Sequence, residues 1–391
     1  MNQSSAGHST KDFMEEVTKA YEISQDRQVT EFDEVPTSYR VLTPEWLTAV
    51  LCREVPDAAV VSFELGPRDD GSSNRRRISL TYNDAGTRAG LPVSVFCKAA
   101  EQLQNRVILA VLDVARAEAE FYTNVRNRLD IEVPRTWYAG FDPKTFAYLI
   151  MMEDLAGTAQ FPDERTILTR AQAEDMVRLL ATLHSRFYDS AELGTEALPF
   201  KTWPAFWTDL TATPGFPEAC DAGFAAAESV LPARLFARRS EIWPATEKSV
   251  VRHDELPQTL LHSDVHFKNW YIRHDDGRMG LTDWQIATVG HWSRDFVYAT
   301  TTALTVEQRR DWQLDLLRLY LELMADKGVR DITFDDALLN IRQQLFTTLA
   351  FWTITLVPTD DMAPMQREEL TFEMLRRIGA AIDDYDALDA F

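Results

Sequence analysis

The sequence is poor in cysteine and in basic residues. Its three cysteines, Cys52, Cys97 and Cys220, are odd in number and far apart. This spacing excludes a disulfide framework and a CxxC metal or redox site, and it predicts a reducing compartment. The 61 acidic residues outnumber the 40 basic ones, so the formal net charge is −21. Nucleic acids and anionic membranes are bound through clustered Lys and Arg, and we therefore expect neither as a partner.

Long hydrophobic runs are also missing. The sequence has no uninterrupted apolar stretch of about 18 residues, which is what a membrane-spanning helix requires. Residues 1–16 are polar and lack the apolar core of a signal peptide. We therefore expect a cytoplasmic protein. Its oligomeric state is left open by the sequence.

The composition is otherwise that of a folded globular protein. Hydrophobic residues make up 45% of the chain and charged residues 26%, both within the ordinary range. A chain of 391 residues is long enough for two lobes with a sizeable core and a short extension.

The pattern after residue 57 predicts strands and one helix. Short β-rich runs lie between residues 58 and 99 and are separated by glycine-bearing segments, as in an antiparallel meander. Residues 109–129 consist of good helix formers with an apolar stripe, which predicts a helix after the third strand. The apolar run 146–152 is too short for a typical core helix and suits a buried strand.

From about residue 160 the pattern is that of helices. Capping-box pairs that start a helix occur at Thr169 with Gln172 and at Thr305 with Gln308. Further helices are expected at 335–356 and 365–383. In the tryptophan-rich segment 200–245, aromatic core packing is favoured over a helical cover for a binding cleft.

These patterns together predict an α+β fold. An N-terminal lobe of antiparallel sheet plus helix is expected at 41–155, and a mainly α-helical lobe at 156–391. Residues 1–40 are expected to be an N-terminal extension, either a loosely held arm or an added helix.

The histidines suggest a metal site. Five of the seven lie between His253 and His291, and His262 and His266 have the i, i+4 spacing of a zincin helix. The HExxH motif, however, requires Glu where this chain has Ser263, and the run lies between strand candidates. A zinc-dependent hydrolase, active without nucleotide, is therefore a weak alternative.

Phosphoryl transfer fits the same segment better. It requires a carboxylate near the attacking hydroxyl, oxygen ligands for a divalent metal, and a cation on the phosphates. Asp264 can accept or orient the hydroxyl proton, while Asn269 and Asp283 offer the hard oxygen ligands that magnesium prefers. Each residue alone is commonly a cap or turn residue, but their order and spacing favour a functional role.

Two segments carry a family resemblance. HSDVHFKN at 262–269, and DWQIATVG at 283–290 followed by Asp295 and Phe296, resemble motifs of the aminoglycoside phosphotransferase and choline kinase-like superfamily. Those motifs read HGDxHxxN and DWxxxxxG followed by Asp. The one departure is Ser263, where the family usually has Gly; this change affects the backbone and removes no catalytic atom.

The resemblance implies a bilobal protein kinase-like fold and a small-molecule kinase. ATP, or alternatively GTP, would be the phosphate donor, Mg²⁺ the cofactor, and a hydroxyl group of a small molecule the acceptor. Asp264 would be the base or orienting carboxylate, and Asn269 and Asp283 the metal ligands. His262, His266 and Asp295 would organise the loop.

The resemblance extends towards the N-terminus from about residue 58. It implies a phosphate-covering turn, a lysine on the phosphates with a glutamate partner on the next helix, and a connector that binds adenine. The turn residues are Gly71, Ser72, Ser73 and Asn74; the ion pair is Lys98 with Glu118, for which Glu120 is a competitor; the connector is Met152, Glu153, Asp154 and Leu155. His184 on the first long helix of the second lobe is expected to be structural.

The acceptor itself is not defined by these motifs, because a fold and its phosphate machinery are shared by many activities. The strand of Lys98 and the E-x-x-F-Y pattern at Glu118 resemble the ecdysteroid-kinase-like and hydroxyacyl-kinase branches. The alternatives are an aminoglycoside-type antibiotic kinase and a kinase-like protein that binds nucleotide without catalysis.

Overall fold

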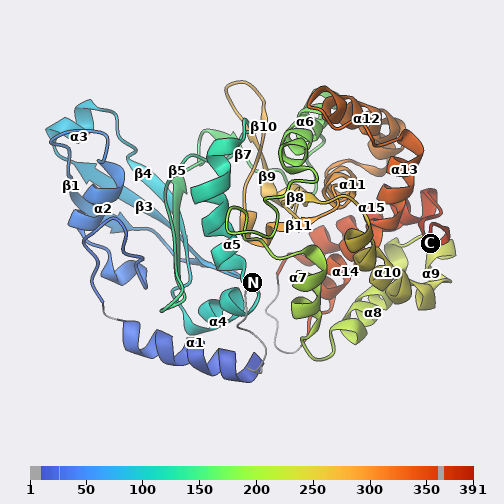
Figure 1. Cartoon of the computed structure of the whole chain (residues 1–391), viewed down its shortest axis with the longest axis horizontal. Coiled ribbons are helices and arrows are strands. Elements are labelled where there is room, and N and C mark those ends of the chain that lie inside the picture. The colour runs from blue at the N-terminus through green and yellow to red at the C-terminus, as the bar shows by residue number, and fades with distance from the viewer. Residues whose placement is uncertain (1–9, 26, 360–364) are drawn as a thin grey trace. The chain divides into compact units, whose positions relative to one another are not determined.

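The computed structural model describes residues 10–25, 27–359 and 365–391, which form two compact units (Figure 1). The sheet unit consists of the chain up to Asn127 together with Pro134–Ala156. The helical unit consists of Arg128–Val133 and the chain from Gly157 onward. The chain thus enters the helical unit briefly before it completes the sheet. Of the expected extension 1–40, residues 1–9 and 26 lie outside the described part.

The sheet unit is built on antiparallel strands, which confirms the expected meander. The strands are β1 (Val60–Leu65), β2 (Asp69–Asp70), β3 (Asn74–Tyr82), β4 (Ser94–Ala99), β5 (Thr136–Asp142) and β6 (Ala147–Glu153). Their order is β1-β3-β4-β6-β5, with β2 paired to β3. The apolar run expected as a buried strand is β6, of which all residues but the last are buried.

The two faces of this sheet have different chemistry, because successive strand residues point to opposite sides. Cys97 lies on the face covered by helix α2 (Pro44–Leu51), where Trp46 and Leu47 are buried in the same apolar cluster. Lys98, the next residue, faces helix α5 (Val114–Glu120), where it meets Glu118. The sheet therefore presents an apolar core on one side and an ion pair on the other.

The single helix expected at 109–129 is wrong. Helix α4 (Leu103–Val111) ends before Asp113, α5 begins at Val114, and a π-helical turn η2 (Phe121–Val125) follows. Asp113 has φ +62°, in the left-handed region that Asp tolerates better than most residues, and its carboxylate accepts hydrogen bonds from Arg116. Periodicity alone does not detect such a break, because apolar residues continue on both sides of it.

Residues before the sheet pack onto the sheet unit. Helix α1 (Thr10–Ser24) buries Val17 against Ala110 and Phe146, and the short η1 turn (Tyr39–Val41) lies in the sheet core. Of the two expectations for this extension, the added helix is present as α1 and covers residues 10–24.

The helical unit is mainly α, as expected. Its helices are α6 (Arg170–Phe187), α7 (Trp203–Thr211), α8 (Phe216–Ala226), α9 (Ala233–Phe236), α10 (Ile242–Glu255), α11 (Ser293–Ala303), α12 (Val306–Asp326), α13 (Phe334–Gln343), α14 (Leu345–Leu356) and α15 (Glu368–Asp384). Helix α14 is central and packs against α8, α10 and α15 (Figure 1). Both capping boxes are confirmed at the starts of α6 and α12, whereas the helix expected at 335–356 is two helices, α13 and α14.

Short strands in this unit carry the polar motifs. β7 (Ala159–Gln160), β9 (Trp270–Arg273) and β10 (Met279–Leu281) form one antiparallel sheet, and β8 (Thr259–Leu261) pairs with β11 (Thr288–Gly290). The first motif of the sequence, 262–269, therefore follows β8, and the second, 283–290, follows β10 and ends with β11.

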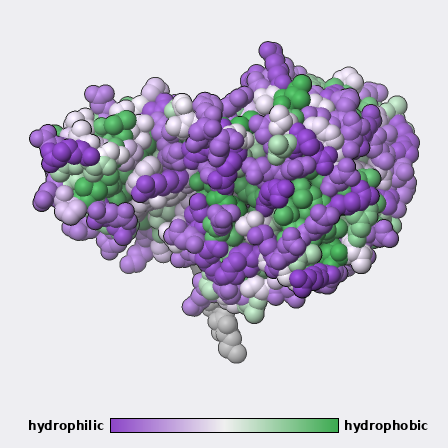
Figure 2. All heavy atoms as spheres, turned by 90° about the horizontal axis from the view of Figure 1, so that it is seen from above, coloured by the Kyte–Doolittle hydropathy of each residue, from purple (hydrophilic) through white to green (hydrophobic). Residues whose placement is uncertain are grey.

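Aromatic residues of the 200–245 segment pack inside the helical unit. Trp203 is fully buried and stacks with Phe206, and Trp207 stacks with Phe351 of α14. Hydrophilic residues cover most of the face shown in Figure 2. Within the described residues, every helix is too short or too polar to traverse a lipid bilayer.

The close approach of α8 to α14 yields a prediction. A Cβ atom added at Gly223 would lie 2.0 Å from the carbonyl oxygen of Thr353, so Gly223→Ala must push the two backbones apart. We expect a loss of about 1–3 kcal/mol and a melting temperature lower by roughly 2–12 °C. Ala222→Ser at an exposed neighbouring position is the control, and equal thermal unfolding of the two variants would contradict the packing argument.

Candidate functional site

Asp264 lies in the loop between β8 and β9, and its carboxylate is held from several sides. The side-chain amide of Asn269 donates to the backbone oxygen of Asp264 at 2.7 Å and to Oδ2 at 3.3 Å. The hydroxyl of Tyr298 donates to Oδ1 at 3.4 Å, and Nε2 of His266 is 3.6 Å from Oδ2. The Asp264 side chain is 21% exposed, so it is oriented by its neighbours and still reachable from solvent.

The backbone of the Asp264 loop is held by Asp295, which lies in the first turn of α11. This fully buried carboxylate accepts the N–H groups of His262 at 2.7 Å and Ser263 at 2.9 Å. Burial raises the pKa of Asp295, but the hydrogen bond and charge of His184 and the charge of Arg294 bring it below its ordinary value. A charged acceptor strengthens both loop hydrogen bonds.

His184 fits the structural role expected for it. The ring is fully buried in α6, with Nδ1 2.8 Å from the hydroxyl of Tyr320 and Nε2 3.4 Å from Asp295. Its backbone oxygen accepts a hydrogen bond from Thr259 of β8. The histidine thereby joins α6 to the strand that leads into the loop.

Ser263, the departure from the family motif, has a left-handed backbone with φ +66°. This conformation costs a non-glycine residue roughly 1–2 kcal/mol, which explains why glycine is usual there. Here the hydroxyl pairs with that of Thr288 at 2.5 Å, and the carbonyl accepts a hydrogen bond from Arg294 at 2.9 Å. These contacts, with the N–H bond to Asp295, hold the strained residue in place.

Arg294 is a fully buried cation beneath the loop. Its guanidinium lies 3.4 Å from the ring centroid of Trp203, and it donates to the hydroxyl of Thr347 as well as to Ser263. Burial lowers the pKa of Arg294 to about 10, so it is still charged at neutral pH. The aromatic segment around Trp203 therefore packs against Arg294, which in turn holds the loop at Ser263.

His262 connects the two motifs. Burial lowers the pKa of this histidine, so the ring is neutral near pH 7. Nδ1 accepts the backbone N–H of Asp264 at 3.2 Å, which leaves Nε2–H to donate to the carbonyl of Thr282 at 2.9 Å. The loop of Asp264 is thus tied to the residue that precedes Asp283.

Asn269 and Asp283 are the residues that could hold a divalent metal. The backbone oxygen of Asn269 accepts the N–H of Thr282 at 2.9 Å, so one ligand candidate is bonded to the residue that precedes the other. Because Nδ2 of Asn269 is used on Asp264, Oδ1 is the atom of this amide that a cation can bind. Asp283 adopts φ +66° before the short turn η7 (Trp284–Ile286). An amide oxygen and a carboxylate fit Mg²⁺.

The zinc alternative gains no support. Both ring nitrogens of His262 are used in hydrogen bonds to the backbone of Asp264 and Thr282, and Nδ1 of His266 accepts the N–H of Lys268. Across residues 10–25, 27–359 and 365–391, no group of three or more His, Cys, Asp and Glu side chains could hold a metal ion.

In the sheet unit, Lys98 pairs with Glu118 and not with Glu120. The ammonium lies 2.9 and 2.8 Å from the two carboxylate oxygens of Glu118, which also accepts the hydroxyl of Tyr148. Both partners are buried, whereas Glu120 bonds Asn124 instead. The pair fixes the lysine relative to α5.

The connector and the turn expected to bind nucleotide also lie in the sheet unit. Met152 and Glu153 end β6, and Asp154 accepts hydrogen bonds from Arg77 and Ser94. Burial raises the pKa of Asp154, but these hydrogen bonds and the Arg77 charge lower it overall. Leu155 is buried.

The turn expected to cover the phosphates lies between β2 and β3. It is formed by Gly71, Ser72 and Ser73, and Asn74 begins β3. Their nucleotide contacts stay a prediction.

Sequence reasoning missed three residues that contact the loop: Thr288, Arg294 and Tyr298. A signal existed for Tyr298, since it lies three residues after Asp295 and therefore on the same face of α11. Nothing in the sequence pairs Thr288 or Arg294 with Ser263, because those contacts depend on how β11 and α11 pack.

The model described as the phosphotransferase enzyme family matches residues 106–331 of this chain, which is more than half of it. The protein belongs to this family.

Solved structures that match this chain have low sequence identity. A Ralstonia eutropha protein described as an aminoglycoside phosphotransferase is 14% identical, with 88% of this chain and 97% of that chain covered and a TM-score of 0.48. For Streptococcus pneumoniae choline kinase the values are 12%, 82%, 94% and 0.44. For Plasmodium vivax ethanolamine kinase they are 9%, 99%, 99% and 0.48. Among curated protein sequences, no match was found.

The left-handed backbone of Ser263 yields a second prediction. Ser263→Val places a β-branched residue at φ +66° and leaves the buried Thr288 hydroxyl without its partner, so we expect a loss of about 2–5 kcal/mol. Ser263→Gly loses the same hydroxyl pair but relieves the backbone, and should be within about 1 kcal/mol of the parent. Thermal unfolding of both variants measures this. Equal destabilisation by Val and Gly would show that the backbone is not strained.

Proposed function

We propose that the protein is a Mg²⁺-dependent kinase that transfers the γ-phosphate of a nucleoside triphosphate to a hydroxyl group of a small molecule. The observation that carries the proposal is the loop of Asp264, whose carboxylate is oriented by Asn269 and remains accessible. The resemblance of this loop to aminoglycoside and choline kinases favours a small acceptor. ATP is the proposed donor, with GTP as the alternative.

Asp264 is the proposed base or orienting carboxylate. The acceptor oxygen would attack the γ-phosphorus as the bond to the β-phosphate oxygen breaks, releasing the nucleoside diphosphate, and the hydroxyl proton would pass to Asp264. Tyr298 and Asn269 hold the carboxylate in one orientation. That orientation supports transfer to a positioned hydroxyl in preference to water.

Three residues are proposed to neutralise the charge of the nucleotide phosphates, directly or through a bound metal ion: Asn269, Asp283 and Lys98. Oδ1 of Asn269 and the carboxylate of Asp283 would hold Mg²⁺, which when bound neutralises charge on the phosphate oxygens. Lys98, kept in place by Glu118, would provide a cation for the nucleotide phosphates. A non-catalytic nucleotide-binding protein is disfavoured because all of these residues are present.

The role of Asp264 is tested with Asp264→Asn, which preserves size and removes the base. Release of ADP from ATP and of GDP from GTP is measured with a panel of aminoglycosides, choline, ethanolamine, sugars, steroids and short hydroxyacyl compounds. For the acceptor that stimulates the parent, we expect kcat to fall about 10²–10⁴-fold. Asp275→Asn, on the exposed turn between β9 and β10, makes the same chemical change away from the loop and should retain full activity. Unchanged turnover in Asp264→Asn would refute the assignment.

The metal role is tested separately. Removal of Mg²⁺ with EDTA should abolish transfer, and added Mg²⁺ should restore it. Asp283→Asn weakens the metal site, so the Mg²⁺ concentration for half-maximal rate should rise by about tenfold or more. A parent enzyme that stays active in EDTA, or a variant with the parent's Mg²⁺ dependence, would contradict this role.

A further inference from the structure

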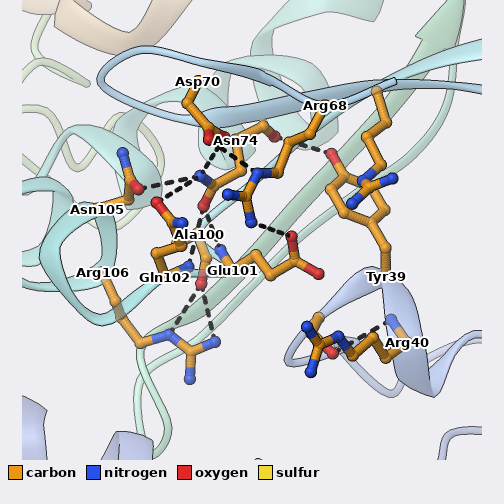
Figure 3. A network of polar contacts seen from close by, with 12 residues as sticks. Tyr39, Arg40, Arg68, Asp70, Asn74, Ala100, Glu101, Gln102, Asn105 and Arg106 are labelled. Atoms are coloured by element: carbon orange, nitrogen blue, oxygen red, sulfur yellow. Dashed lines mark hydrogen bonds and ion pairs between the residues drawn. The ribbon is translucent and has the colours of Figure 1, made fainter. Parts of the chain in front are cut away.

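A buried asparagine joins the expected phosphate-covering turn to the segment that follows Lys98 (Figure 3). Asn74 is fully buried at the start of β3, opposite Ala99 of β4. Its Oδ1 accepts the backbone N–H groups of Glu101 at 2.8 Å and Gln102 at 3.0 Å. Its Nδ2 donates to Asp70 at 2.8 Å. One side chain thus connects the end of β2 to the approach to α4.

A second asparagine completes the link. Asn105, in the first turn of α4, is buried, and its Oδ1 accepts a hydrogen bond from Nδ2 of Asn74 at 3.0 Å. Its own Nδ2 donates to the carbonyl oxygens of Gly71 at 2.7 Å and Ser72 at 2.9 Å. The turn, the strand and the helix are joined by these two amides.

The consequence for the turn is electrostatic. Asn105 occupies the carbonyls of Gly71 and Ser72, and the carbonyl of Ser73 accepts the N–H of Gly71 at 3.0 Å. All three carbonyl oxygens of the turn are therefore engaged within the sheet unit. Carbonyl oxygens repel phosphate, so a turn whose carbonyls are held by the protein repels an anion less than one whose carbonyls are exposed.

The link also fixes the turn relative to Lys98. Asn74 and Ala99 are directly opposite each other in the β3–β4 register, and the next pair is Arg75 with Lys98. Buried, fully bonded amides hold a single conformation, because breaking any one bond leaves a buried polar group unpaired. The chain has no GxGxxG segment here, and a fixed turn does not depend on glycine flexibility.

We propose that Asn74 and Asn105 are positioning residues that hold the turn Gly71–Ser73 in the conformation that binds nucleotide phosphates. The proposal rests on the proposed function, since it needs a nucleotide at this turn. The pair lowers the ordering cost of binding, so its loss affects nucleotide affinity more than turnover at saturation.

The test compares Asn105→Asp with the parent chain. The substitution keeps the size of the side chain and suits the first turn of a helix, but it cannot donate to the two carbonyls. Gln104→Glu is the matched control, because it makes the same amide-to-carboxylate change at an exposed neighbouring position. Asn105→Leu removes the donor without adding charge. Dissociation constants are measured for MgADP and MgGDP. Amide hydrogen exchange is measured on the proteins without nucleotide, and KM and kcat are measured for the nucleoside triphosphate.

For the nucleotide that the parent binds more tightly, we expect both Asn105 variants to raise the dissociation constant and KM by about tenfold. The kcat of these variants, and all three constants of the Gln104→Glu control, should change less than about twofold. Amide exchange should accelerate at residues 71–73 while the rest of the sheet unit stays protected. Parent-like affinity in both Asn105 variants overturns the proposal, as does weakening by Asp alone, which would reflect charge repulsion. General loss of protection would make the pair a requirement for folding instead. Failure of the parent to bind either nucleotide overturns the proposed function itself.

Discussion

The geometry of the catalytic-loop candidate depends on one buried charge, the carboxylate of Asp295. Burying an ion is costly unless hydrogen bonds and opposite charge compensate for it. Asp295 receives the N–H groups of His262 and Ser263, the ring of His184 at 3.4 Å, and the nearby charge of Arg294. Because these partners come from α6, the loop after β8 and α11, the same interactions that stabilise the charge bring the three elements together.

The residues proposed for chemistry are held in place by neighbouring polar side chains. Asp264 is oriented by Asn269 and Tyr298, and Lys98 by Glu118. Each of these supports is wholly or largely buried, so a change there exposes or orphans a polar group as well as moving its neighbour. This is the arrangement expected where a site must keep its geometry without a bound ligand.

Ser263 shows how a departure from a family motif can be accommodated. A serine costs more than glycine in the left-handed backbone of this position, yet its hydroxyl gains a buried partner in Thr288 and its carbonyl is bonded to Arg294. The guanidinium in turn rests on Trp203 of the aromatic segment. Packing in the 200–245 region and the shape of the loop are therefore coupled through a single arginine.

The sequence alone determined the elements with strong local signals. The strands from 58 to 99, the buried strand at 146–152 and both capping boxes were predictable, because alternation and helix capping are encoded within a few residues. The ordered set Asp264, Asn269 and Asp283 was predicted differently, from the needs of phosphoryl transfer and from the family motifs that the two segments resemble. The break at Asp113 was not predictable, because one left-handed residue interrupts a helix without changing its apolar periodicity.

Tertiary structure alone decided that Glu118 and not Glu120 pairs with Lys98, that Arg294 supports Ser263, and that Asn74 and Asn105 meet at the turn. These contacts join residues far apart in the chain, and only the packing of strand on helix brings their polar atoms within hydrogen-bonding distance.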